Sequence, residues 1–163
     1  MPHRGGFCEL LEQHFDVNLP LAGIEIGCFK GDFAAHILNH CPELRLTSID
    51  SFCYWDEVIG NVGRQIHRFR LLQLYSDEAA KILEGRYDFV FIDGDHSYEQ
   101  CKKDILNYAP LVRLGGLVAG HNFHEAHNSA HPGVNKAVRE IYGDRTRLQR
   151  DFIWYIKKEE TDK

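Results

Sequence analysis

The sequence of 163 residues has no apolar run of the length, about 18 residues, that a membrane-spanning helix needs. Its first stretch, MPHRGGFCELLEQ, lacks the apolar core of a signal peptide. Internal repeats, low-complexity tracts and linker-like segments are also missing. We therefore expect one domain over residues 1–163, a cytoplasmic location and no membrane partner.

Basic charge is scarce. Lysine and arginine number 19 against 24 aspartates and glutamates, which gives a formal net charge of −5. Nucleic-acid binding rewards a basic surface, so we expect no nucleic-acid partner. The basic residues gather only in residues 64–70 and 145–150, where solvated helix faces explain them.

Cysteine is present in an odd number and in no CxxC pair. This pattern argues against a zinc ribbon and against a disulfide framework. The five cysteines are Cys8, Cys28, Cys41, Cys53 and Cys101. We interpret them as reduced thiols that mostly fill space in the core.

Strand-like and helix-like segments alternate along the chain. Apolar runs typical of buried strands occupy residues 21–27, 45–50, 71–76, 87–93, 116–120 and 152–157. Helical patterns occupy residues 32–40, 77–83, 98–112 and 134–142. Such alternation indicates an α/β fold, with a mostly parallel sheet covered by helices on both faces.

Polar residues follow the first five of these strands. They are Glu25 with Gly27, Asp50 with Ser51, Ser76 with Asp77, Asp93 to His96, and His121 with Asn122. In doubly wound sheets the ligand lies outside the carboxyl ends of the strands. This coincidence is the main reason to expect a functional site at that edge.

The first strand–helix turn has the features of a nucleoside-binding loop. Gly27 permits a tight turn and close backbone approach, and Gly31 lets the helix start near the strand. Asp50 follows Gly27 by 23 residues, and a carboxylate there can take both ribose hydroxyls. Bulky Phe29 and acidic Glu25 disfavour the pyrophosphate of a nicotinamide dinucleotide. They suit a cationic cofactor without phosphate, such as S-adenosylmethionine (SAM).

Two longer stretches resemble a known family. GIEIGCFKGDFAAHIL looks like the first motif of class I SAM-dependent methyltransferases, in its E-x-G-x-x-x-G form. YDFVFIDGDHSYEQCKKDILNYAPLVRLGGLVAGHNF resembles the fourth- and fifth-strand region of methyltransferase family 24, with the DGDHSYE string, Asp104 and the P-L-x-x-x-G-G turn. That family is related to macrolide-sugar O-methyltransferases and, more distantly, to catechol O-methyltransferase. The resemblance covers roughly residues 20–140.

The resemblance implies a Rossmann-like, doubly wound, mostly parallel seven-stranded sheet with helices on both faces. It also implies an O-methyltransferase for a small hydroxylated acceptor, such as a sugar or a phenol. The SAM-binding residues it implies are Glu25, Gly27, Gly31, Asp50, Ser51, Phe52, Ser76, Asp77 and Asp93. For Ser76 and Asp77, a plain helix N-cap and first turn is the alternative.

The catalytic residues are also carried over by the resemblance. His96 occupies the position of a general base, and the ordinary pKa of histidine, ~6.5, suits that role. Its alternative is a turn residue beside a helix cap. Asp93, His121 and Asn122 would bind Mg²⁺ or Mn²⁺. At positions 121–122 the family more often has His-Asp than His-Asn. The neutral Asn122 would weaken Mg²⁺ binding. Coordination by His121 would favour Mn²⁺, Fe²⁺ or Zn²⁺.

The His-Asn departure keeps a second hypothesis open, a degenerate domain that binds SAM or S-adenosylhomocysteine (SAH) without turnover. A nicotinamide-dependent oxidoreductase is the third hypothesis.

Residues 123–133 contain His124, His127 and His131. Their spacing is not the H-E-x-x-H of zinc proteases, and we expect this loop to cover the acceptor. Residues 52–63 are aromatic at their start and could stack on an acceptor or belong to the core. A second subunit of a homodimer is another source of acceptor contacts.

Overall fold

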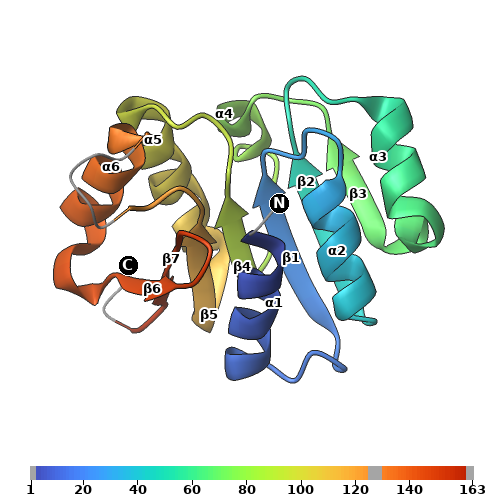
Figure 1. Ribbon diagram of the computed structural model, residues 1–163, viewed down its shortest axis with the longest axis horizontal. Helices are drawn as coiled ribbons and strands as arrows, with labels where there is room; N and C mark the ends of the chain where they lie inside the picture. The colour runs from blue at the N-terminus through green and yellow to red at the C-terminus, as the bar shows by residue number, and fades with distance from the viewer. Residues whose placement is uncertain (1–2, 125–129, 161–163) are drawn as a thin grey trace.

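A computed structural model describes residues 3–124 and 130–160. Among these residues, seven strands form one sheet in the order β3-β2-β1-β4-β5-β7-β6 (Figure 1). Their bounds are β1 Leu21–Ile26, β2 Leu44–Ile49, β3 Phe69–Leu72, β4 Tyr87–Ile92, β5 Val112–Gly120, β6 Arg147–Gln149 and β7 Ile153–Lys157. The first five strands pair in parallel, whereas β7 pairs antiparallel with both β5 and β6. The predicted doubly wound, mostly parallel fold is confirmed.

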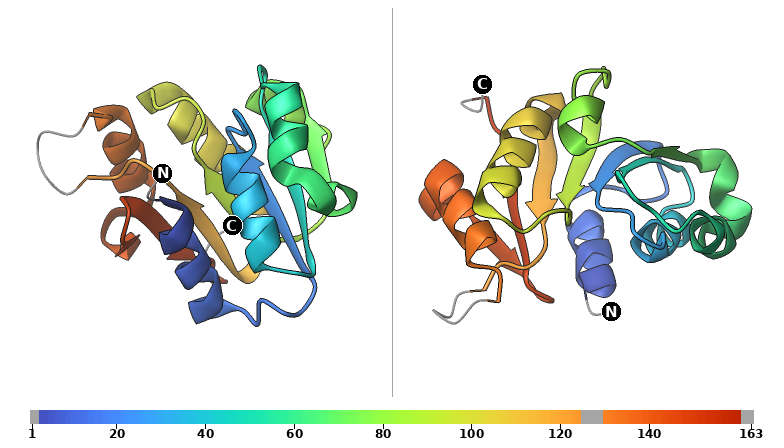
Figure 2. Two further views of the ribbon diagram at one scale, coloured as in Figure 1. Left: turned by 45° about the vertical axis from the view of Figure 1, so that its right-hand side comes forward. Right: turned by 90° about the horizontal axis from the view of Figure 1, so that it is seen from above.

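Helices cover both faces of the sheet (Figure 2). The helices are α1 His3–His14, α2 Asp32–His40, α3 Trp55–Val62, α4 Ser76–Ala79, α5 Tyr98–Tyr108 and α6 Pro132–Tyr142, with 3₁₀ turns at Gly63–Arg68, Ala109–Leu111 and Gly143–Arg145. The first three helices share one hydrophobic cluster with the sheet, and the last three share the other. The helices that follow β1 and β2 thus pack on one face of the sheet, and the helix that follows β4 packs on the other. The carboxyl ends of these three strands border a cavity.

The alternation of buried side chains along β4 explains how one strand serves both layers. Phe89 and Phe91 point into the cluster under α1 and α2, while Val90 and Ile92 belong to the other cluster. On the first face Phe7 of α1 lies 4.6 Å, ring centroid to ring centroid, from Phe91. Because the last four side chains of the strand, from Phe89 to Ile92, are all buried, this part of the strand is continuously apolar in the sequence.

Several element boundaries differ from the sequence prediction. The third strand is Phe69–Leu72 rather than residues 71–76, and the helix expected at residues 77–83 ends at Ala79. Helix α5 ends at Tyr108 because Pro110 forms a 3₁₀ turn, after which β5 already begins. The elements α1, α3 and β6 were not predicted. All five cysteines are free and buried, as expected.

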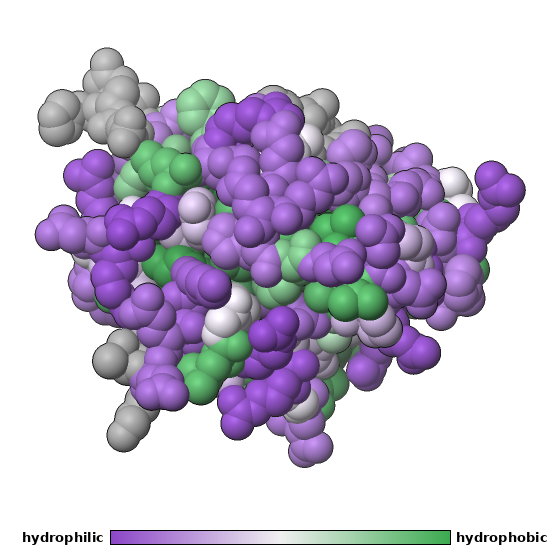
Figure 3. Space-filling model, turned by 90° about the horizontal axis from the view of Figure 1, so that it is seen from below, coloured by the Kyte–Doolittle hydropathy of each residue, from purple (hydrophilic) through white to green (hydrophobic). Residues whose placement is uncertain are grey.

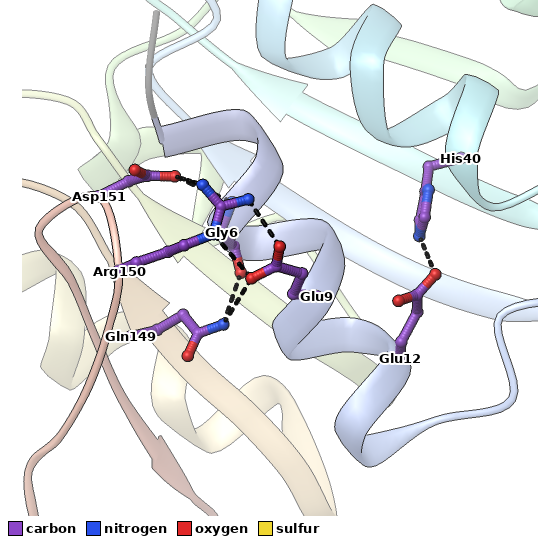
Figure 4. Close-up of polar contacts among 7 residues, drawn as sticks. All are labelled: Gly6, Glu9, Glu12, His40, Gln149, Arg150 and Asp151. Atoms are coloured by element: carbon purple, nitrogen blue, oxygen red, sulfur yellow. Dashed lines mark hydrogen bonds and ion pairs between the residues drawn. The ribbon is translucent and has the colours of Figure 1, made fainter.

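The β6–β7 turn anchors α1 (Figure 4). Asp151 Oδ2 accepts hydrogen bonds from the backbone N–H of Gly6 and from Arg150, both at 3.0 Å. Arg150 also donates two hydrogen bonds of 2.7 Å to Glu9, and these hydrogen bonds are the main cause that lowers the pKa of Glu9. A Cβ atom on Gly6 would lie 2.7 Å from the carbonyl oxygen of Arg150, so the glycine permits this close contact. The turn therefore satisfies an N–H group that a helix start leaves unpaired.

The face at the amino ends of the parallel strands is mostly hydrophilic, with small separate hydrophobic spots (Figure 3). Within residues 3–124 and 130–160, no helix combines the length and apolar character needed to cross a bilayer.

We expect Asp151→Ala to lower the free energy of unfolding by about 1–2 kcal/mol, because the variant loses the cap of α1 and is strained at a φ of 66°. Asp151→Asn keeps an oxygen and tolerates that backbone, so it should lose less. Urea denaturation measures both. Glu12→Ala is the control, since Glu12 contacts His40 in a half-exposed pair (Figure 4) and should change stability by about 0.5 kcal/mol or less. Equal losses in all three variants would contradict the capping role.

Candidate active site

A cavity of about 610 Å³ lies at the carboxyl ends of β1, β2 and β4 and extends to α4 and α5. It is lined by Ile26, Gly27, Phe29, Ile49, Asp50, Ser51, Phe52, Leu74, Tyr75, Ser76, Asp77, Asp93, Gly94, Asp95, Gln100 and Asp104. Its size is that of a site for a nucleoside-sized ligand. The loops predicted to hold a cofactor and the loop after β4 thus meet in one place.

Gly27 makes this meeting possible. It has a φ of 94°, a conformation that favours glycine, and its N–H donates to the carbonyl oxygen of Ile49 at 2.9 Å. A Cβ atom here would lie 2.2 Å from the carbonyl oxygen of Asp93. Any side chain here would therefore push the end of β1 away from Asp93, the residue that follows β4.

Asp50 is fixed in place by backbone amides. Its Oδ2 accepts a hydrogen bond from the N–H of Phe29 at 2.7 Å, and its Oδ1 accepts one from the N–H of Phe52 at 3.0 Å. Phe29 reaches this position at a φ of 51°, which is uncommon for a bulky residue. The carboxylate is thus oriented towards the cavity with lone pairs available on both oxygens.

Glu25 and Gly31, both predicted to bind the cofactor, do not line the cavity. Glu25 is 1% exposed and accepts a short hydrogen bond from the hydroxyl of Ser48, and its Oε1 has no hydrogen-bond partner among the described residues. Burial raises the pKa of Glu25 to about 8, and the nearby carboxylates of Asp93 and Asp50 also raise it. Gly31 has a φ of 74° and lies against Val58 of α3. Direct cofactor contact by these two residues stays a prediction.

The α4–α5 end of the cavity carries a polar network. The Ser76 hydroxyl donates to Asp104 Oδ1 at 2.6 Å, and Gln100 Nε2 donates to the same oxygen at 3.0 Å. Gln100 Nε2 also lies 3.2 Å from Asp77 Oδ1. Helix α5 thus supplies two cavity residues, Gln100 and Asp104, for which no binding role was predicted. No spacing pattern in the sequence links them to the loop residues that they contact.

Charge in the cavity is of one sign. Five aspartates line it: Asp50, Asp77, Asp93, Asp95 and Asp104. Its lining, all of it within the described residues, includes no lysine, arginine or histidine. Such a surface favours ligands that carry positive charge or hydrogen-bond donors and disfavours phosphates.

Four polar side chains form a cluster where β4 and β5 end. His96 Nε2 lies 3.3 Å from Asp93 Oδ1, and His121 Nδ1 lies 3.5 Å from the same oxygen. His121 Nδ1 is 2.5 Å from Asn122 Oδ1. The hydrogen bond to Asp93 is the main cause that raises the pKa of His96, and burial opposes it. Since Asp93 also lines the cavity, the cluster adjoins the cofactor end of the site.

The same cluster contains the predicted metal ligands. Within the described residues, no group of three or more His, Cys, Asp and Glu side chains is arranged to hold a metal ion. A site built from Asp93, His121 and Asn122 would instead include an amide oxygen. His121 Nδ1 and Asn122 Oδ1 are 2.5 Å apart and form a hydrogen bond, which would have to break before the ring nitrogen could coordinate an ion. Mixed oxygen and nitrogen donors suit Mn²⁺ better than Mg²⁺.

Part of the predicted acceptor loop lies beside this cluster. The His131 ring centroid is 4.2 Å from that of His96, and burial together with the charge of neighbouring histidines lowers the pKa of His131. The His124 ring stacks on Phe152, and its backbone is held by the side chain of Asn135. His127 lies outside the described residues. The His131 end of the loop thus lies beside the cluster of Asp93, His96, His121 and Asn122, and coverage of an acceptor by this loop stays a prediction.

The aromatic start of residues 52–63 is exposed rather than part of the core. Phe52 is 68% exposed, Trp55 45% and Tyr54 38%. The Tyr54 ring lies 5.1 Å from Phe29 and 5.5 Å from Phe52, centroid to centroid. These rings form a rim beside the cavity, because Phe29 and Phe52 also line it.

We expect the free energy of unfolding to fall as the pH rises from 5 to 8, partly through Glu25. Its pKa in the folded protein, about 8, is above its ordinary value of 4.5, so the folded state binds the proton more tightly and loses this advantage as the pH approaches 8. Glu25→Gln is neutral throughout and should give a flatter profile, by at most about 1.4 kcal/mol per pH unit. Urea denaturation at several pH values tests this. Parallel profiles for the two proteins would contradict it.

Comparisons with known proteins agree with this geometry. The family model of methyltransferase family 24, described as a methyltransferase domain, matches residues 24–123. A viral relative, the uncharacterized protein R132 of Acanthamoeba polyphaga mimivirus, is 28% identical over 135 residues. That alignment covers 74% of this chain and 61% of the viral protein, so the chain spans less than two thirds of its relative's length.

Solved structures show the same fold. The O-methyltransferase NovP matches with a TM-score of 0.73 at 18% identity, over 97% of this chain and 80% of NovP. The MycE methyltransferase of the mycinamycin biosynthetic pathway, in complex with Mg, SAH and mycinamycin VI, matches with a TM-score of 0.66 at 17% identity, over 95% of this chain and 49% of MycE. Since the family match takes in more than half of the sequence, including the cavity loops and His96, the chain belongs to methyltransferase family 24.

Proposed function

We propose that the protein is a SAM-dependent O-methyltransferase for a small hydroxylated acceptor, with His96 as the general base. The observation that carries the proposal is the cavity with five aspartates and no basic side chain in its lining. SAM bears a positive sulfonium and an ammonium group and has no phosphate, whereas a nicotinamide dinucleotide would bring its pyrophosphate to these carboxylates. The charge of the cavity therefore supports SAM over the dinucleotide.

Individual residues support a nucleoside ligand. Asp50 is held by two backbone amides in a position to accept hydrogen bonds from ribose hydroxyls. Ser51 and Phe52 line the cavity beside it. Ser76 and Asp77 also line the cavity, and the adenine ring of the cofactor would lie near them. Gly27 lets the methionine part pass close to the backbone, with buried Glu25 behind the loop.

The contacts of His96 support its proposed role as the base. Asp93 accepts a hydrogen bond from His96 Nε2, so the lone pair that takes a proton is on Nδ1. When bound, SAM supplies a methyl group that passes to the acceptor oxygen as its bond to sulfur breaks, leaving SAH. His96 Nδ1 takes the proton of the acceptor hydroxyl, and Asp93 stabilises the resulting imidazolium. The role of the remaining site residues is alignment of the two reactants.

Metal assistance is part of the proposal, with Asp93, His121 and Asn122 as the protein ligands. A divalent cation there would lower the pKa of an acceptor hydroxyl bound to it. Support comes from the position of Asp93 and Asn122 on either side of His121 and from the Mg in the MycE complex. The acceptor would lie between the aromatic rim of Phe29, Phe52 and Tyr54 and the His131 end of the predicted acceptor loop. A sugar or phenol ring would find both stacking and polar partners there.

A degenerate domain that binds SAM or SAH without turnover is the second candidate. It is favoured by the His-Asn pair, since a neutral amide replaces the carboxylate that is more common in the family. The two candidates share the cavity and differ only in the competence of the cluster at His96.

The cofactor is tested by calorimetric titration of SAH into the purified protein, with NAD as the control ligand. We expect SAH to bind and NAD not to bind. Asp50→Asn should weaken SAH binding about 10-fold or more, because one carboxylate oxygen that accepts from the ribose becomes a donor. Asp56→Asn, which removes the same charge from an exposed residue outside the cavity lining, is the control. Absence of SAH binding with EDTA, Mg²⁺ or Mn²⁺ alike would end the proposal.

The base is tested with His96→Ala in an acceptor screen that follows SAH formation. We expect a loss of methyl transfer of about 100-fold or more with SAH binding retained, because the variant keeps the cavity but has no group to take the proton. His67→Ala, on an exposed 3₁₀ turn, is the matched control. Unchanged turnover in His96→Ala would remove the base from the proposal. No turnover in the unmodified protein, despite SAH binding and added Mn²⁺ or Mg²⁺, would favour the degenerate domain.

A further inference from the structure

Hydrogen bonds at the edge of the His96 ring do not by themselves fix the direction of the ring. His96 Nε2 lies 3.3 Å from Asp93 Oδ1, slightly beyond the usual range for a hydrogen bond, and the His96 side chain is 33% exposed. Asn122 also hydrogen bonds to the ring. The torsion that turns a histidine ring is broad, because it joins an sp³ carbon to an sp² carbon. A contact on the face of the ring is therefore needed to direct Nδ1.

His131 supplies a contact of that kind. The centroids of the His131 and His96 rings lie 4.2 Å apart, and the ring planes differ by 39°. His131 is half-buried and is the N-cap residue of α6. The ring that covers His96 therefore comes from the start of a helix, and α6 packs beside α5, the helix that follows His96 (Figure 1).

Gly133 brings the start of α6 close enough for this contact. A Cβ atom on Gly133 would lie 2.6 Å from the carbonyl oxygen of His96 and 2.5 Å from the backbone nitrogen of Tyr98. The φ of Gly133 is not positive, so the backbone conformation would accept alanine and only the close contact excludes it. The first turn of α6 thus packs directly on the backbone that carries His96.

Asn135 joins the same turn of α6 to the chain that follows β5. Its Oδ1 accepts a hydrogen bond from the N–H of His124 at 3.0 Å, and its Nδ2 donates to the carbonyl oxygen of His124. His124 follows Asn122 by two residues. One helical turn therefore holds both sides of the cluster, the His96 backbone through Gly133 and the segment after Asn122 through Asn135.

We propose that His131 is a positioning residue for the general base, whose ring stacks on the face of His96 and keeps Nδ1 directed at the acceptor hydroxyl. The inference rests on the proposed role of His96 and adds to it the group that fixes its direction. His96 still takes the proton of the hydroxyl, and His131 neither gains nor loses one. The rings contact each other by their faces, so their nitrogens are not aligned for a proton relay.

The charge state of His131 suits this role. Burial lowers the pKa of His131, the charges of neighbouring histidines lower it further, and Asp93 opposes them. The neutral ring is therefore favoured, and a neutral aromatic face attracts a cation such as the imidazolium that forms on His96. Phenylalanine offers a face of the same kind without a proton to exchange. The positioning role should therefore survive in His131→Phe and be lost in His131→Ala.

The experiment compares methyl transfer by the unmodified protein, His131→Ala and His131→Phe, with the acceptor found in the screen. We expect His131→Ala to lower kcat about 10-fold or more, because a misdirected base acts on the transition state, with the KM for SAM and the SAH dissociation constant changed less than about 3-fold. In His131→Phe, kcat should stay within about 3-fold of the unmodified value. Equal kcat values in the two variants would overturn the inference.

His14→Ala is the matched control. The His14 ring is also half-buried and also packs on an aromatic ring, that of Tyr155, at 5.6 Å between centroids. His14 does not line the cavity. Its loss therefore removes a histidine ring contact of the same kind without access to the base, and kcat should stay unchanged.

The ring contact can also be measured without turnover. Diethyl pyrocarbonate modifies unprotonated histidine nitrogens, and mass spectrometry can follow the modification of His96 in a tryptic peptide, residues 87–102, that contains no other histidine. At one fixed pH, His96 should be modified faster in His131→Ala than in the unmodified protein, and no faster in His131→Phe. An unchanged rate in His131→Ala would show that His131 does not cover the base and would overturn the inference.

Gly133→Ala keeps the inference testable if His131→Ala does not fold. Its Cβ should separate the start of α6 from the His96 backbone without removing either ring. We expect faster modification of His96 and a lower kcat, as in His131→Ala. Rates of modification and turnover equal to those of the unmodified protein would contradict the contact.

The two proposals fail in different ways. If His96→Ala retains turnover, the proposed base is wrong and the positioning role falls with it. If His96→Ala abolishes turnover but His131→Ala transfers methyl groups as fast as His131→Phe, the base stands and His131 only contributes to the packing of α6.

Discussion

The close approach of two backbone segments at Gly27 is the constraint on which the site depends. The carbonyl oxygen of Asp93 occupies the space that a Cβ of Gly27 would need, and the N–H of Asp93 donates to Ile26. The cofactor loop after β1 is thus joined directly to the residue that begins the catalytic cluster. On its other side the Gly27 N–H donates to Ile49, which sets the position of Asp50. One glycine therefore brings together residues that follow three strands. A side chain there would displace the loop after β1, and so move the proposed cofactor site away from the proposed base, His96.

The acidity of the site connects its function to the stability of the fold. Glu25 and Asp104 are buried with one oxygen each unsatisfied, and burial raises the pKa of both. Carboxyl groups in this state reduce stability as they ionise, because the folded protein has to bury a charge without a cation beside it. A cationic, donor-rich ligand would offset that cost. We therefore see the unpaired carboxyl groups as the reason that binding and folding should be coupled in this protein, with the ligand completing interactions that the chain leaves open.

Patterns local in sequence account for what could be predicted. The central strands are continuous apolar runs, and the glycine turn with Asp50 at a fixed distance marks the loop, so the fold and the edge that holds the site followed from them. Helix α1 was missed because Gly5 and Gly6 weaken a helical pattern, and their need arises from contact with a turn more than 140 residues away. The same limit applies to Asp104, whose partner Ser76 is 28 residues distant. Whether a side chain lines a cavity, as Asp104 does, or lies behind it, as Glu25 does, depends on such tertiary contacts.

Asp93 takes part in both proposed ways of activating the acceptor, the His96 base and the bound metal ion. Its Oδ1 is within reach of both His96 and His121, so the negative charge that makes His96 a better base is the same charge that a cation would need. A cation on Asp93 and Asn122 would weaken the attraction between His96 and the carboxylate, yet it would also make an acceptor hydroxyl easier to deprotonate. A general base and a metal ion could therefore substitute for each other in part in activating the acceptor hydroxyl. With a neutral amide at position 122, the cluster would bind a cation less strongly than two carboxylates would, and the proposed balance would shift towards proton removal by His96. The His-Asn pair is then consistent with an active enzyme that relies more on its histidine than on a metal.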